Sequence, residues 1–114
     1  MVQRGVPDPT SSVVVLLSTL PTAEKAAEIA RVLVEENLAA CVNLVPGLRS
    51  IYRWNDAVSD DAETLAIIKT TVARRDALAE RLIALHPYEV PELLELSVRG
   101  GHAPYLAWVA ASVS

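Results

Sequence analysis

The stretch His86-Pro87-Tyr88-Glu89-Val90-Pro91 separates a helix predicted over residues 74–85 from the last predicted strand, residues 93–98. Proline has no amide hydrogen and restricts the residue before it to extended geometry, so neither a helix nor a strand ladder can continue here. We therefore expect a shaped loop at this junction. Loops held between rigid elements are where binding residues concentrate. The alternative interpretation is a stiff connector whose tyrosine only packs.

The segments around this loop show alternating strand and helix patterns. Apolar runs typical of strands cover residues 13–17, 41–45, 48–54, 64–71 and 93–98, and helical spacing covers 22–37 and 74–85. Thr22 is the predicted N-cap of the first helix, and Pro104 suits the first turn of a closing helix. We interpret Pro46-Gly47 as the turn of a hairpin and the acidic stretch 55–61 as a loop.

This order of elements predicts the fold class. A β-α-β-β-α-β chain with an added C-terminal helix is an α+β protein of the ferredoxin-like sandwich type. We expect one such domain over residues 12–114, preceded by a flexible N-terminal tail over residues 1–11. The fold places both helices on one face of a four-stranded sheet and leaves the other face bare. Because the predicted strands are apolar on both faces, we expect another copy of the chain to cover the bare face.

The composition favours self-association over membrane insertion. Of the 114 residues, 52% are hydrophobic and only 4% aromatic, and the mean hydropathy of +0.31 is high for a small soluble chain. The longest apolar run, Val13 to Leu17, is far shorter than the roughly 20 residues of a membrane-spanning helix. The surplus apolar surface is therefore expected to be buried between subunits.

The charge and the cysteine content indicate which kinds of partner and which cellular compartment are expected. The net charge of −4 and the pI of about 5.1, with basic residues scattered, disfavour nucleic acid. The single cysteine rules out an internal disulfide and suits a reducing compartment. The N-terminus lacks the charged and then apolar pattern of a secretion signal. We therefore predict a cytoplasmic protein.

Several side chains could carry binding chemistry. Tyr52 and Trp54 share one face of a predicted strand, either as an interface or core stripe or as a platform for a ligand. Cys41 is either an inert packed residue or a thiolate that Lys69 could activate, and Lys69 is otherwise a strand-end residue whose ammonium reaches water. The acidic residues of the predicted loop region are a solvated stretch or a loose site for a hard cation; they are Asp56, Asp60, Asp61 and Glu63.

Five blocks of sequence together carry a family resemblance. They are Leu38-Ala39-Ala40-Cys41-Val42-Asn43, Ser50-Ile51-Tyr52-Arg53-Trp54, Ile68-Lys69-Thr70-Thr71, His86-Pro87-Tyr88-Glu89-Val90-Pro91-Glu92 and Tyr105-Leu106-Ala107-Trp108. With these blocks in order, the chain resembles the CutA family of divalent-ion tolerance proteins over nearly all of Val13 to Ser112.

The resemblance implies a ferredoxin-like subunit in a compact homotrimer, related in architecture to the nitrogen-regulatory PII signalling proteins. It also implies a role in tolerance to divalent cations, particularly copper, in bacteria. Copper-binding proposals for the family use a cysteine near the end of the first strand and histidines in the His-Pro-Tyr region. In this chain Ser18 and Leu85 stand at two of those positions, and only His86 carries over.

We therefore predict a cytoplasmic homotrimer that binds or responds to a divalent metal ion, copper or zinc, without nucleic acid or membrane as a partner. The predicted ligand-binding cleft lies between subunits and is formed by Tyr52, Trp54, Lys69, Tyr88 and Glu89, with His86 and Cys41 as metal ligands. Lys69 would pair with an anion. Cys41, His86 and Glu89 lack a local catalytic signature, so we predict that the chain is not an enzyme. The alternatives are a PII-like sensor that binds a small anionic metabolite and signals to an unidentified partner protein, and a structural trimer without a ligand.

Overall fold

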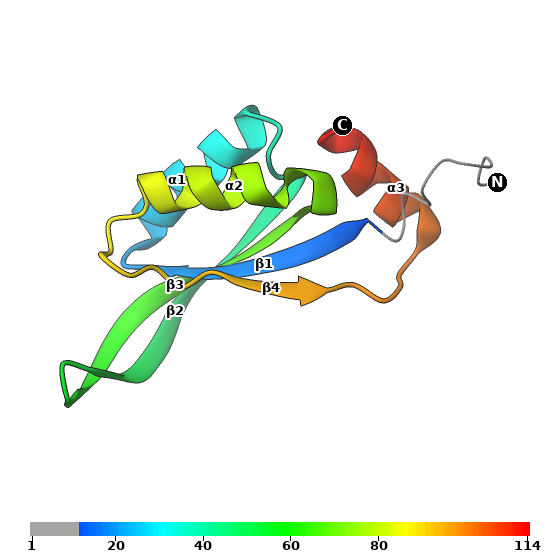
Figure 1. Cartoon of the computed structure of the whole chain (residues 1–114). Helices are drawn as coiled ribbons and strands as arrows, with labels where there is room; N and C mark the ends of the chain where they lie inside the picture. The colour runs from blue at the N-terminus through cyan, green and yellow to red at the C-terminus, as the bar shows by residue number, and fades with distance from the viewer. Residues whose placement is uncertain (1–11) are drawn as a thin grey trace.

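The computed structural model describes residues 12–114, so the predicted tail over residues 1–11 lies outside the described residues. The elements are β1 (Val13–Leu20), α1 (Ala23–Glu35), β2 (Cys41–Trp54), β3 (Ala57–Thr71), α2 (Val72–Leu85), β4 (Leu94–Ser97) and α3 (Ala103–Ser112). The expected β-α-β-β-α-β order with a closing helix is confirmed. The strands form one sheet in the order β2-β3-β1-β4 with antiparallel pairing throughout, and α1 and α2 lie on the same face of it (Figure 1).

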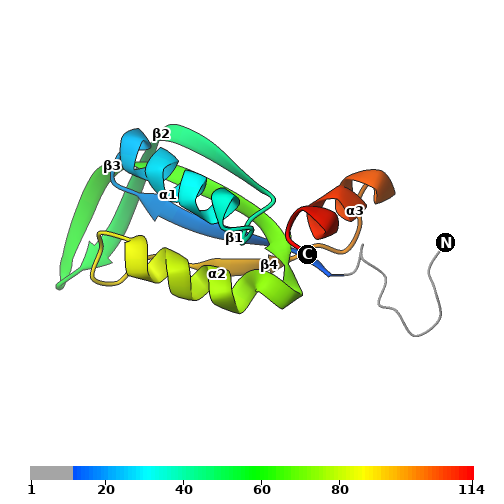
Figure 2. The ribbon, with the colours of Figure 1, turned by 90° about the horizontal axis from the view of Figure 1, so that it is seen from above.

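The main core lies between this sheet and the two helices. On β1 and β3, Leu16 and Ile68 are paired and both point toward the helices, where they are almost completely buried. Helices α1 and α2 contribute the remaining large apolar side chains of the cluster, which are Ile29, Leu33, Leu78 and Leu82. A second, smaller cluster joins α3 to the start of β1, and α3 lies apart from α1 and α2 (Figure 2).

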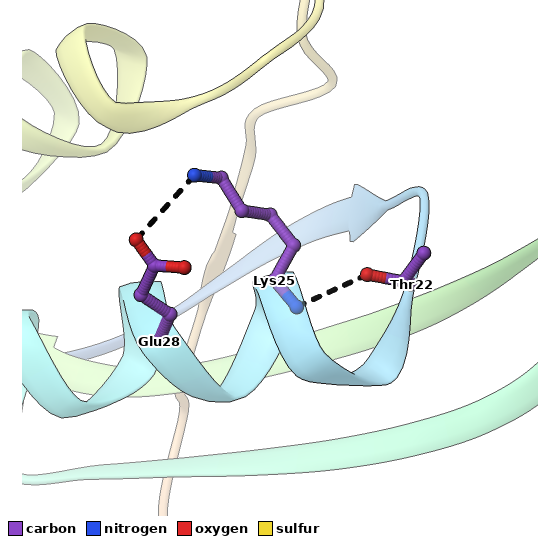
Figure 3. A network of polar contacts seen from close by, with 3 residues as sticks. All are labelled: Thr22, Lys25 and Glu28. Atoms are coloured by element: carbon purple, nitrogen blue, oxygen red, sulfur yellow. Dashed lines mark hydrogen bonds and ion pairs between the residues drawn. The ribbon is translucent and has the colours of Figure 1, made fainter.

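The start of α1 follows the sequence prediction. Thr22 has an extended backbone, and its Oγ1 accepts a hydrogen bond from the Lys25 amide at 3.1 Å (Figure 3). The Lys25 ammonium also lies 3.5 Å from a Glu28 carboxylate oxygen one turn later. The hydroxyl cap satisfies one of the free amides of the first turn, whereas the exposed ion pair adds little stability.

The predicted hairpin between residues 41–45 and 48–54 is wrong. These residues form one continuous strand, β2, and Pro46-Gly47 is an irregularity in its pairing with β3 between Val45 and Leu48. Proline is tolerated there because β2 is an edge strand of the sheet and a bulge needs no ladder bond at that position. The hairpin turn is instead Asn55-Asp56, whose φ values of 50° and 61° suit a tight two-residue turn. The predicted loop 55–61 therefore belongs mostly to β3.

The bulge changes which side chains of β2 share a face. Before it, Val45 lies opposite Leu65; after it, Leu48 lies opposite Glu63. Residues directly opposite one another in an antiparallel pair point to the same side, so even-numbered residues after the bulge share the side of odd-numbered residues before it. Ser50, which lies opposite Asp61, is therefore on the same side of the strand pair as Glu63.

The outer part of this strand pair extends beyond the rest of the sheet. We call residues 48–63 the hairpin arm, because β1 pairs with β3 only from Thr64 to Thr71 (Figure 1). The arm has no neighbouring strand within residues 12–114. It extends past the ends of α1 and α2, so its side chains are largely exposed.

The face of the sheet opposite the helices is apolar and bare. We define the bare face by the cross-strand partners Val15, Leu17, Leu65, Ile67, Leu94 and Leu96. Leu94 and Leu96 remain 55% and 48% exposed, and the others are half-buried. No element among residues 12–114 covers this face. None of the helices in the described part of the chain is long and apolar enough to cross a membrane.

Candidate functional site

A cleft of about 820 Å³ lies between the hairpin arm and the loop that follows α2. We call it the cleft; its volume falls in the range of roughly 300–1,000 Å³ that is usual for small-molecule sites. Its walls combine aromatic, acidic and apolar side chains, namely Thr19, Ser50, Ile51, Tyr52, Trp54, Asp61, Glu63, Pro87, Tyr88, Glu89, Val90, Pro91 and Glu92. Tyr52, Trp54, Tyr88 and Glu89, which the sequence predicts to form a ligand-binding cleft, all line it, and their role in binding stays a prediction.

The loop is held in place by hydrogen bonds to β1. His86 is buried, and its Nε2 lies 2.9 Å from the backbone oxygen of Thr19, while its Nδ1 accepts the Tyr88 amide at 3.1 Å. Because Nδ1 acts as an acceptor, the proton of the neutral ring is on Nε2 and is donated to Thr19. Ser18 is also buried and donates its hydroxyl to the backbone oxygen of Glu92 at 2.8 Å. The two ends of the loop are therefore fixed to the same strand.

Two tyrosine hydroxyls donate to carboxylates of β3. Tyr52 donates to Asp61 Oδ2 at 2.5 Å, and Tyr88 donates to Glu63 Oε2 at 2.6 Å, which joins the loop to the arm. The hydrogen bond to Asp61 raises the pKa of Tyr52. Burial, and then the hydrogen bond to Glu63, raise the pKa of Tyr88. Both phenols therefore remain protonated donors at neutral pH.

The cleft is strongly acidic. Asp61 and Glu63 come from β3, and Glu89 and Glu92 come from the loop. Among the described residues, no Lys or Arg lines the cleft. Glu63 is only 8% exposed, and the hydrogen-bond donor to its carboxylate is the neutral Tyr88 hydroxyl. The electrostatic potential in the cleft therefore favours a positively charged occupant.

Lys69 and Cys41 lie together, but away from the cleft. They are directly opposite one another on β3 and β2, on the side of the bare face. The Lys69 ammonium donates to Asn43 Oδ1, and the Cys41 thiol lies 3.9 Å from the same oxygen. Lys69 is four residues along β3 from Leu65, the partner of Thr19, which corresponds to about 13 Å. Neither residue lines the cleft, and Cys41, His86 and Glu89 do not form a cluster.

The donors of one chain do not form a metal site. Within residues 12–114, no group of three or more His, Cys, Asp or Glu side chains is placed to hold a metal ion. His86 is next to the cleft, but both ring nitrogens are already hydrogen-bonded to backbone atoms. To bind a metal through Nδ1, its ring would have to give up the bond from the Tyr88 amide.

The structure orders the acidic wall of the cleft. Asp61 and Glu63, for which the sequence predicts either a solvated stretch or a loose site for a hard cation, lie on β3 and line the cleft, and Glu92, which has no predicted role, lines it from the loop. The signal that could have placed the first two is the pair Asn55-Asp56, a residue combination that favours a two-residue hairpin turn. With the turn at that place, Asp61 and Glu63 are two residues apart on one strand, so their side chains point to the same side.

The chain is similar in sequence and in fold to known proteins. The model of the CutA1 divalent ion tolerance protein family matches residues 14–112. The chain belongs to this family. The divalent-cation tolerance protein CutA of Thermus thermophilus is 53% identical over 95 residues, which cover 83% of this chain and 92% of that protein. The chloroplastic protein CutA 1 of Oryza sativa is 44% identical over 99 residues, or 87% of this chain but only 56% of that longer protein.

A solved member of the family has the same fold. The crystal structure of CutA from Xylella fastidiosa superposes with a TM-score of 0.89 at 40% sequence identity, covering 91% of this chain and all of that one. The α+β architecture with a four-stranded antiparallel sheet and three helices, seen here over residues 12–114, is thus shared with this CutA.

Proposed function

We propose that this chain acts in tolerance to divalent cations. The match of the CutA1 family model to residues 14–112 carries this proposal, and relatives are named for divalent-cation tolerance. Those names describe tolerance and no enzymatic activity, which supports a non-catalytic role. The chain has a single cysteine, Cys41, which suits a reducing compartment and so supports a cytoplasmic location.

We propose further that the chain is a ferredoxin-like subunit of a homotrimer. The support is the bare face, where Leu94 and Leu96 expose about half of their surface to water. Burying such a patch between copies is favourable by about 25 cal/mol for each Å² of apolar surface removed from water. Sedimentation equilibrium at micromolar concentration should give three times the 12.3 kDa chain mass. A single-chain mass would contradict the trimer and leave the family membership untouched.

The cleft is the proposed place where divalent cations are attracted. Its carboxylates offer oxygen ligands on two walls, and a cation could be held there through water molecules or with donors of a neighbouring subunit. Copper or zinc coordination by His86 and Cys41 remains a prediction. These two residues lie apart in one chain. An ion bound by both would therefore need His86 from one subunit and Cys41 from another.

Metal analysis of the purified protein, followed by titration calorimetry with Cu²⁺, Zn²⁺ and Mg²⁺, tests the proposal. Glu89→Gln removes one charge from the cleft and should weaken binding of the cation that the wild type binds. Glu80→Gln, an exposed residue of α2 outside the cleft, removes the same charge and should leave binding unchanged. His86→Ala and Cys41→Ser identify any role of the predicted ligands, with thermal unfolding as a check on folding. Absence of binding for all three cations would contradict the proposal.

The predicted alternative of an anionic metabolite has no support in the cleft. Lys69, the residue expected to pair with the anion, lies on the bare face, and the acidic lining would repel a phosphate or carboxylate ligand. We therefore do not propose the PII-like sensor as a second function.

A further inference from the structure

We propose that the cleft binds a small organic polycation, an aliphatic diamine or polyamine with two or more ammonium groups. This inference rests on the cleft and not on the proposed role in metal tolerance. The volume of about 820 Å³ is suited to a small molecule and far exceeds what one metal ion needs. Within residues 12–114 no group of three or more His, Cys, Asp or Glu side chains is placed to hold a metal ion directly, whereas an organic cation does not need such a group.

The carboxylates of the cleft lie on two separate walls. Asp61 and Glu63 come from the hairpin arm, whereas Glu89 and Glu92 come from the loop after α2. A ligand that neutralises both walls needs positive charges at two places, which a flexible aliphatic chain with terminal ammonium groups provides. Each ammonium group donates up to three hydrogen bonds, and such charge-assisted bonds are roughly twice as strong as neutral ones.

Glu63 gives the most specific argument for a cationic occupant. Its side chain is 8% exposed, and the donor that reaches its carboxylate is the neutral hydroxyl of Tyr88. A buried charge is costly unless it is paired, and no Lys or Arg of the described chain lines the cleft to pair with it. A ligand ammonium group would supply the missing charge.

The aromatic residues suit the same ligand. Tyr52 and Trp54 are 40% and 45% exposed on the arm, and Tyr88 faces them from the loop side of the cleft lining. Ammonium groups and the methylene groups next to them are attracted to aromatic faces. The hydroxyls of both tyrosines are already bound to carboxylates, so these side chains lose little freedom when a ligand arrives.

Direct binding of putrescine and spermidine to the full chain tests the proposal. We expect saturable binding in titration calorimetry at moderate salt, tighter for spermidine than for putrescine. N-acetylputrescine, which keeps the chain but loses one charge, should bind at least about tenfold more weakly because it reaches only one wall. Choline serves as a test of a single compact cation and should also bind weakly.

The location of binding can be read from fluorescence. The chain has two tryptophans, and Trp108→Phe leaves Trp54 as the reporter in the cleft. Saturating putrescine should change its emission with the same midpoint as the calorimetric titration. In the reverse variant, Trp54→Phe, the emission of Trp108 on α3 should not respond.

Charge variants distinguish a built site from general attraction. Glu89→Gln combined with Glu92→Gln should weaken spermidine binding by about tenfold or more. Neither carboxylate has a hydrogen-bond or ion-pair partner among the described contacts, so folding should be unaffected. Glu35→Gln combined with Glu80→Gln removes the same charge from the helices and should leave binding within about twofold.

Three results would overturn the proposal: no binding of either amine, equal binding of N-acetylputrescine, or equal weakening by the two double variants. The metal titrations are carried out without amines and are read separately. Amine binding without metal binding would sustain this inference and contradict the proposed metal role, and metal binding without amine binding would do the reverse.

Discussion

The two faces of the sheet are built from the same strands, but only one of them is covered. On the helix side of β3, Ala66 and Ile68 are 4% and 1% exposed. On the opposite side of β4, Leu94 and Leu96 are 55% and 48% exposed. Both sides are apolar, a pattern typical of strands buried on both faces. Within residues 12–114 the helices cover one face and leave the other exposed, and the proposed trimer would supply the second covering layer.

The largest expected effect comes from the covered face. Leu78 on α2 is fully buried, and Leu78→Ala should lower the free energy of unfolding by about 2–5 kcal/mol because it leaves a cavity in the main core. Ile83 lies on the same helix but is 52% exposed, so Ile83→Ala should cost no more than about 0.5 kcal/mol. Urea unfolding at one fixed protein concentration measures both. Equal losses would mean that the two sides of α2 are covered alike.

The bare face is tested by a charge placed in its centre. If the proposed trimer buries this face, Leu96→Asp should convert it to single chains, because a buried unpaired carboxylate is unfavourable. Ser97 is the next residue of β4 and points to the other side of the sheet, so Ser97→Asp should keep the assembly intact. Sedimentation velocity at micromolar concentration distinguishes the two. If the wild type and both variants all sediment as single chains, the bare face is not a subunit contact.

The bulge in β2 decides which side chains meet each face. Gly47 has a φ of +78°, and a Cβ placed there would meet no heavy atom within 4 Å. Gly47→Ala should therefore cost about 1–2 kcal/mol through backbone strain alone. Gly100→Ala, at a position with equal space and no positive φ, is the control and should be close to neutral. Thermal unfolding measures both, and a neutral Gly47→Ala would mean that the bulge relaxes without strain.

The smallest effect concerns an ion pair that joins the two helices over the covered face. Arg81 donates two hydrogen bonds to Glu36, at 2.9 and 2.8 Å. The hydrogen bond from Arg81 lowers the pKa of Glu36 below its ordinary value of 4.5. A lowered pKa in the folded state means that the stabilisation is fully present above about pH 4.5 and is lost as the pH falls through the folded value.

Melting temperatures measured between about pH 6 and pH 3 should therefore fall more steeply for the wild type than for Glu36→Gln. Glu35→Gln, one residue away and without an ion pair to an Arg or Lys, should follow the wild type. Added salt should reduce the difference, because the pair is exposed. Identical slopes for all three proteins would show that the pair contributes nothing measurable.

Much of the fold could be predicted from local sequence patterns. Thr22 as a helix cap and the end of α2 at His86-Pro87 follow from short-range rules, and both are confirmed. The hairpin was misplaced because Pro46-Gly47 is a strong turn signal. That signal cannot be told from a bulge in an edge strand without knowing the partner strand.

The site was only partly accessible from sequence. Tyr52, Trp54, Tyr88 and Glu89 all line the cleft, because they flank loops and alternate on a strand, and their role in binding stays a prediction. The sequence left the acidic residues open between a solvated stretch and a loose cation site, because it placed the hairpin turn at Pro46-Gly47. The turn at Asn55-Asp56 makes Asp61 and Glu63 part of an ordered strand. Lys69 was assigned to the cleft because sequence alone gives no distance along a strand between two sites.

By itself, the sequence determined the order of the elements, the apolar character of both sheet faces and the family, since each depends on residues close together in the chain. Only the tertiary structure decided that the bulge at Gly47 turns Ser50 to the side of Glu63, and that both ring nitrogens of His86 form hydrogen bonds with backbone atoms. These facts depend on the register between strands and on contacts between residues far apart in sequence, such as His86 with Thr19. Such contacts form only when the whole chain has packed.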